Sequence, residues 1–164
     1  MSGQLMFASI AITMALILYT IGVFTERHRG ALTGPILALF WLGLVCDSTG
    51  TAIMTSMARG NAGASAPAIH GITGALAIVL MLFHAGWATL VWLRGRKGGE
   101  KALEQQRAFH RFSTIVWLLW LVPYLIGLFV GMPMLHMGTA PAVVASIAVV
   151  AVLAIILLRP KRNR

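Results

Sequence analysis

The chain alternates between long apolar runs and short polar connections. Five runs reach the roughly 20 residues that a helix needs to cross the hydrocarbon core of a bilayer. They cover about 5–24, 32–57, 69–93, 112–132 and 140–158. None shows the alternation of apolar and polar positions typical of a strand, and lipid accommodates only helices or closed barrels. The pattern therefore predicts an all-α integral membrane bundle, with five spanning helices in a single domain over residues 1–164.

The composition supports a membrane protein and excludes several other classes. Of the 164 residues, 59% are hydrophobic and only 10% are charged, whereas a soluble domain carries about 25% charged residues. A soluble globule and a disordered chain are therefore excluded. The single cysteine, Cys46, leaves no pair for a structural disulfide and no thiol-based metal cluster.

The basic residues predict the orientation of the chain. The formal net charge of +9 would suggest nucleic acid in a soluble protein. Twelve of the 13 lysines and arginines, however, lie in 25–31, in 94–111 or after 158, and only Arg59 lies elsewhere. With five spans these three segments share one side, so the N-terminus is expected outside and the C-terminus in the cytoplasm. We interpret the charge as a topology signal, so the expected partner is the lipid bilayer, and nucleic acid is not expected as a partner.

Ionisable residues inside a span are candidates for function, because they are costly to place in lipid. Asp47 lies near the middle of the second span, and His84 lies deep in the third. The remaining acids are expected at the cytoplasmic edge and are Glu26, Glu100 and Glu104. No P-loop, nucleophile elbow, zinc-protease motif or dinucleotide fingerprint occurs, so no enzyme class is indicated.

His70 and His84 share one face of the third span. Fourteen residues of helix rotate to about 40° short of four full turns and rise about 21 Å. The segment from His70 to His84 is similar to the ligand helix of membrane b-type cytochromes, which hold hemes between such His-x13-His helices. The resemblance implies heme b and electron transfer between membrane quinol and a partner. The position fourteen residues after His110 is Tyr124, so a second bis-histidine heme is not indicated.

The partner of His84 depends on how the third and fourth spans pair. A hairpin that turns at Lys97 places His84 opposite His110, and we favour this pair as axial ligands of one heme iron. Arg107 and Arg111 flank His110 and would then pair with the heme propionates. Their alternative role is that of topology anchors.

A second register follows if the hairpin is centred near residue 102, as the apolar boundaries suggest. It places His70 opposite the segment Met134–His136 and leaves His110 at the cytoplasmic interface. Thioethers and an imidazole also suit Cu(I), so Met134 and His136 form a candidate copper site. A plain loop is the better interpretation of this segment.

Asp47 and His84 each lie about nine residues from one end of their spans, so both are expected near the midplane. A contact between them would form a proton relay, or Asp47 would orient a ligating imidazole. Alternatively, Asp47 is a structural acid bonded to a neighbouring hydroxyl, Ser48, Thr49 or Thr51. The second class of function is therefore a non-heme membrane module that uses Asp47 and His84, either a proton-coupled transporter or channel or an accessory subunit of a larger membrane complex.

Two longer stretches carry a resemblance to a family. The segments HGITGALAIVLMLFHAGWATLVW (70–92) and FHRFSTIVWLLWLVPYLIGLFVGM (109–132) are similar to small bacterial membrane proteins of the HsmA-like family. The resemblance implies five spans in one domain and marks the histidine and aspartate positions as worth testing. It implies no particular reaction.

Overall fold

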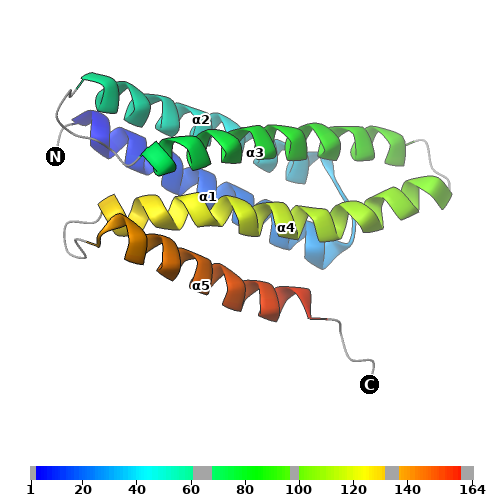
Figure 1. Cartoon of the computed structure of the whole chain (residues 1–164). Helices are drawn as coiled ribbons and strands as arrows, with labels where there is room; N and C mark the ends of the chain where they lie inside the picture. The colour runs from blue at the N-terminus through cyan, green and yellow to red at the C-terminus, as the bar shows by residue number, and fades with distance from the viewer. Residues whose placement is uncertain (1–2, 61–67, 97–99, 132–136, 160–164) are drawn as a thin grey trace.

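The computed structural model describes residues 3–60, 68–96, 100–131 and 137–159, except the side chains of 60, 68–71 and 100–103. The described residues form five α-helices, as the apolar runs predict (Figure 1). Their bounds are α1 Gly3–Arg29, α2 Gly34–Gly60, α3 Ala68–Gly95, α4 Glu100–Gly131 and α5 Thr139–Leu158. Each is long and apolar enough to cross a membrane.

The helices run alternately up and down, and α4 occupies a central place among them (Figure 1). The most extensive pairing joins α1 and α2, while α4 contacts α1, α3 and α5. Helix α5 lies on the outer side of α4 and is the least buried of the five. Its last turn is held by Arg27, whose guanidinium donates to the carbonyl oxygen of Leu157 over 2.6 Å. A basic side chain at the end of a helix satisfies a carbonyl that has no partner within the helix.

One end of the bundle collects most of the positive charge, and we call it the basic end. The C-terminal ends of α1, α3 and α5 meet the N-terminal ends of α2 and α4 there (Figure 1). Its described basic side chains are Arg27, Arg29, Arg94, Arg96, Arg107, Arg111 and Arg159, and Arg59 lies at the opposite end. The charge asymmetry expected from the sequence is therefore also an asymmetry of the folded bundle.

The outer surface of the bundle is apolar. Large side chains such as Leu76, Val79, Val144 and Ile156 are each more than 60% exposed. A continuous apolar surface of this kind is unfavourable in water and marks contact with lipid or with another protein. The surface is thus consistent with contact with a lipid bilayer.

Glycines allow α1 and α2 to approach closely. A Cβ atom added at Gly43 would lie 2.5 Å from Cε1 and 2.6 Å from Cδ1 of Tyr19. A Cβ atom at Gly50 would lie 2.9 Å from the carbonyl oxygen of Ala8. Small residues at such positions let helix backbones pack tightly in the absence of a hydrophobic driving force. The α1–α2 pair is therefore a close-packed unit that supports the buried residues of both helices.

The substitution Gly43→Ala is expected to destabilise the bundle, because the new methyl group overlaps the buried ring of Tyr19. Overpacking of a well-filled core typically costs about 1–3 kcal/mol. The matched control is Gly86→Ala on α3, where no atom lies within 4 Å of the added Cβ. Thermal unfolding in detergent, followed by circular dichroism, should give a lower Tm for Gly43→Ala only. Equal Tm values for the two variants would contradict close packing at Gly43.

Two helices extend beyond the apolar runs that predict them. Helix α1 continues past Phe24 to Arg29, and α4 begins at Glu100, twelve residues before Phe112. The added turns are polar in sequence but pack against neighbouring helices, as the full burial of Glu26 and Phe109 shows. An apolar run therefore marks the part of a helix suited to lipid, whereas tertiary packing decides where the helix ends.

Candidate functional site

One face of α4 forms hydrogen bonds or an ion pair with polar residues of three neighbouring helices. The α4 residues are His110, Ser113, Trp117 and Trp120, and their partners are Glu26, His84, Thr20 and Asp47. At about 100° per residue, the four α4 positions fall within about 80° of the helix circumference. They cover ten residues, or about 15 Å of helix length. We call these eight residues the α4 track.

The track begins at the basic end with an acid and a histidine. The Nδ1 atom of His110 lies 3.0 Å from each carboxylate oxygen of Glu26, at ion-pair distance. The Glu26 side chain is fully buried, whereas His110 is 30% exposed. A buried carboxyl group needs a partner because it has lost its water. His110 provides that partner and at the same time connects the pair to the surface.

His84 forms the next part of the track. Its Nε2 atom lies 3.0 Å from the hydroxyl oxygen of Ser113, and both side chains are fully buried. The imidazole stacks on Phe109 with ring centroids 5.2 Å apart and meets the edge of Phe40 on α2 at 4.6 Å. His84 is therefore enclosed by the bundle and does not face its outer surface. The aromatic rings and the hydroxyl fix the orientation of the imidazole.

Two tryptophans complete the track away from the basic end. The indole N–H of Trp117 donates to the Thr20 hydroxyl over 3.2 Å, and the indole N–H of Trp120 donates to a carboxylate oxygen of Asp47 over 2.8 Å. Asp47 is only 5% exposed. The ring of Tyr19 packs edge-on against Trp120, with centroids 5.0 Å apart. Asp47 therefore has a hydrogen-bond donor from α4 within an aromatic environment.

The contacts between α3 and α4 determine the register of this helical hairpin. His84 bonds to Ser113, and Trp87 packs on Phe112 with centroids 4.5 Å apart. The sequence midpoints of these two pairs lie between residues 98 and 100, close to the predicted turn at Lys97. The alternative centred near residue 102 is wrong, because the polar start of α4 is helical and packs on α3.

His84 and His110 nevertheless engage different groups. Phe109 stacks on His84, and His110, the next residue of α4, lies about 100° further around the helix axis. His110 contacts Glu26 on α1. The observed register is close to the one that turns at Lys97, and it brings the two histidines to similar heights. It does not direct their imidazoles at one common point. Axial ligation of one heme iron by both stays a prediction.

Asp47 and His84 do not share a depth, contrary to the sequence expectation. His84 lies beside Phe40, and Asp47 follows Phe40 by seven residues, which is about 10 Å along α2. On α4, their partners Ser113 and Trp120 are also seven residues apart. The expectation failed because it counted residues from the apolar boundaries, which the helices overrun. Asp47 and His84 are joined through α4 rather than by a direct contact.

Two polar atoms beside the track are buried without a partner. Within the described part of the chain, the Tyr19 hydroxyl and the Nδ1 atom of His84 have no hydrogen-bond partner. Leaving a buried polar atom unpaired costs about 1–3 kcal/mol. A functional role is one explanation for a buried polar atom that has no partner.

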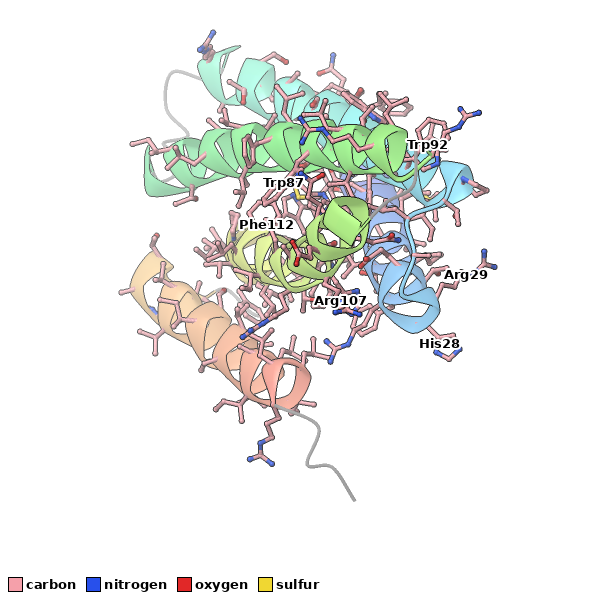
Figure 2. All side chains as sticks on the ribbon, turned by 90° about the vertical axis from the view of Figure 1, so that its right-hand side faces the viewer. His28, Arg29, Trp87, Trp92, Arg107 and Phe112 are labelled. Carbon is pink, nitrogen blue, oxygen red and sulfur yellow. The ribbon has the colours of Figure 1, made fainter. Side chains whose placement is uncertain are left out.

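The other predicted site residues either lie apart from the α4 track or are not among the residues that the structure describes. Arg107 and Arg111 are exposed on α4 near the basic end. Figure 2, viewed toward this end, shows Arg107 apart from the partly buried aromatic residues Trp87 and Phe112. The side chain of His70, and Met134 and His136 entirely, lie outside the described residues. Within the described residues, no group of three or more His, Cys, Asp or Glu side chains suits a metal ion.

Glu26 is the functional candidate that the sequence reasoning missed, because it was expected at the cytoplasmic edge. A signal was nevertheless present. The buried residues of α1 recur at helical spacing, from Ala8 and Ala15 through Tyr19 and Gly22 to Glu26. Continuing that pattern past the apolar run would have placed Glu26 on the buried face of the helix.

Comparisons of the chain with protein-family models, with curated proteins and with solved structures found no match. The functional argument therefore rests on the α4 track.

Proposed function

We propose that the chain is a five-pass protein of a bacterial inner membrane that takes up and transfers protons along the α4 track. Its N-terminus lies outside and its basic end faces the cytoplasm. The observation that carries the proposal is the series of polar contacts on one face of α4, about 15 Å long, with a buried carboxyl group at each end.

Six of the eight residues of the track carry groups suited to proton transfer, whereas Trp117 and Trp120 only donate hydrogen bonds that hold Thr20 and Asp47 in place. Carboxyl, imidazole and hydroxyl groups both accept and donate protons, and chains of such groups form proton relays in membrane proteins. His110 is the exposed entrance, and Glu26 is its buried partner. His84 and Ser113 follow one turn deeper. Asp47, with the Tyr19 hydroxyl nearby, is the terminal proton acceptor of the described track.

The cost of the arrangement supports a function. An acid at the centre of a membrane span costs about 2.5–3.5 kcal/mol even on insertion scales. Glu26 and Asp47 are both buried in an otherwise apolar bundle. Apolar side chains at these positions would pack without that cost. The retained acids are thus explained by chemistry that apolar residues cannot perform.

Reconstitution tests the proposal directly. Liposomes containing the purified protein and an internal pH-sensitive dye are given a membrane potential with potassium and valinomycin. Proton entry should exceed that of protein-free liposomes at least tenfold. An entry rate equal to that of protein-free liposomes would overturn the proposal. The result also separates a proton conductor from an accessory subunit that is inert alone.

A second candidate function is heme binding, and the unpartnered Nδ1 of His84 favours it. The Glu26 carboxylate on His110 Nδ1 is also the kind of contact that orients a metal-ligating imidazole. His84 and His110 each fit the role of a ligand, although their contacts do not direct them to one iron. A bound heme would supply one-electron transfer, for which membrane quinol and another membrane subunit are the proposed partners.

An absorbance spectrum tests this second function. Protein purified from heme-replete cells should show a Soret band that shifts on reduction with dithionite. His84→Ala should abolish or greatly weaken the band, whereas His28→Ala, at an exposed position of α1, should leave it unchanged. A colourless wild-type preparation would end the heme interpretation and leave the proton proposal untouched.

A further inference from the structure

A shallow groove, wide open to the outside, runs along the outer face of α1 toward the basic end. It has a volume of about 520 Å³ and is lined by Thr20, Ile21, Phe24, Thr25, His28 and Arg29. Its deeper part is mainly apolar, because Ile21 and Phe24 are 48% and 37% exposed. Its outer end carries an imidazole and a guanidinium group. From Thr20 to Arg29 the groove follows about 13 Å of helix.

The inner wall of the groove is fixed by α4. Phe24 meets the edge of Trp117 with centroids 5.5 Å apart, and Thr20 accepts a hydrogen bond from the same indole. His28 and Arg29, in contrast, point outward from the end of α1 (Figure 2). The groove therefore combines a supported apolar wall with an exposed imidazole and an exposed guanidinium group at one end.

We propose that this groove binds one anionic phospholipid, with its phosphate at His28 and Arg29 and an acyl chain along Ile21 and Phe24. The order of the lining residues matches the order of groups in such a lipid. The imidazole and guanidinium groups lie at the end of α1, where a headgroup lies if α1 spans the bilayer, and the apolar groups lie deeper. Basic residues at this level attract anionic headgroups. A soluble phosphate would gain nothing from the apolar wall, so the two-part lining favours a lipid.

Native mass spectrometry of the detergent-solubilised protein tests the site. Titration with phosphatidylglycerol should give one retained lipid at a concentration at which phosphatidylcholine is not retained. The double variant His28→Gln/Arg29→Gln should weaken this retention at least fivefold, a factor typical of one lost basic contact. Ile21→Ser should weaken it as well, because it makes the acyl wall polar. Circular dichroism should show that all variants remain folded, since these side chains are largely exposed.

The matched control is Arg94→Gln/Arg96→Gln, which removes two cations from the same end of the bundle but outside the groove. It should leave phosphatidylglycerol retention within twofold of the wild type. An equal loss in both double variants would overturn the proposal in favour of diffuse attraction to the basic end. Equal retention of the two lipids would overturn it too. If glycerol phosphate displaces the bound phosphatidylglycerol, the site binds only the anionic headgroup, and the proposed acyl contact is overturned.

Discussion

Replacing His110 with alanine is expected to lower the free energy of unfolding by about 3 kcal/mol. The substitution leaves the fully buried Glu26 carboxyl group without the imidazole that lies 3.0 Å from both of its oxygens. Breaking a buried pair by removing one partner costs about 3–5 kcal/mol. The lower end applies here because His110 is 30% exposed. Denaturation by SDS in mixed micelles, followed by circular dichroism, measures the change.

A double-mutant cycle distinguishes the loss of this pair from the loss of packing. The double variant Glu26→Ala/His110→Ala should be more stable than the sum of the two single effects predicts. It removes both members of the pair, so neither is left buried without its partner. Arg111→Ala is the matched control: this residue follows His110 but is exposed, so its effect should stay within about 0.5 kcal/mol. Additive single effects would mean that Glu26 and His110 do not stabilise one another.

The apolar pattern predicted the helices well because lipid imposes a minimum length and excludes other structures. The five predicted runs correspond one to one with α1 to α5. The position of His84 within a helix long enough to span the bilayer also followed from the apolar pattern, but its burial did not, because the neighbouring Phe83 is 60% exposed. These features depend on one helix at a time, which is why a single sequence suffices to predict them.

The partners within the site depend on pairs of helices, and the apolar pattern carries little information about such pairs. Asp47 was assigned to neighbouring hydroxyls or to His84, but its donor is Trp120, 73 residues later in the chain. Glu26 was placed at the cytoplasmic edge, outside the span, because the apolar run ends at Phe24, yet α1 continues and keeps it buried against α4. Rotation about each helix axis and the depth at which two helices cross decided both outcomes.

The arrangement of the track explains why α4 tolerates so many polar contacts in an apolar bundle. Each of its four α4 residues has a partner on a different helix: α1 provides Glu26 and Thr20, α2 provides Asp47, and α3 provides His84. Hydrogen bonds of this kind between helices fix the relative positions of the helices. The same contacts therefore orient the four helices and hold the groups that would exchange protons.

Asp47→Asn is expected to reduce proton entry into liposomes at least tenfold while leaving the fold intact. The amide oxygen of asparagine can still accept the N–H of Trp120, which lies 2.8 Å from the carboxylate in the wild type, so the helix contact is preserved. A carboxyl group can accept and release a proton, whereas the amide group of asparagine cannot serve as a proton carrier. The dye-loaded liposome assay measures the rate, and circular dichroism with size-exclusion chromatography checks the fold.

Two further variants make the result specific to the track. Glu104→Gln removes an acid of the same chain at an exposed position of α4 and should conduct protons at the wild-type rate. Trp120→Phe keeps the Asp47 carboxyl group but removes its donor, so it should lower stability by about 1–3 kcal/mol while proton entry remains well above that of Asp47→Asn. If Asp47→Asn conducts as fast as Glu104→Gln, then Asp47 only holds α2 against α4. In that case protons follow a route other than the α4 track.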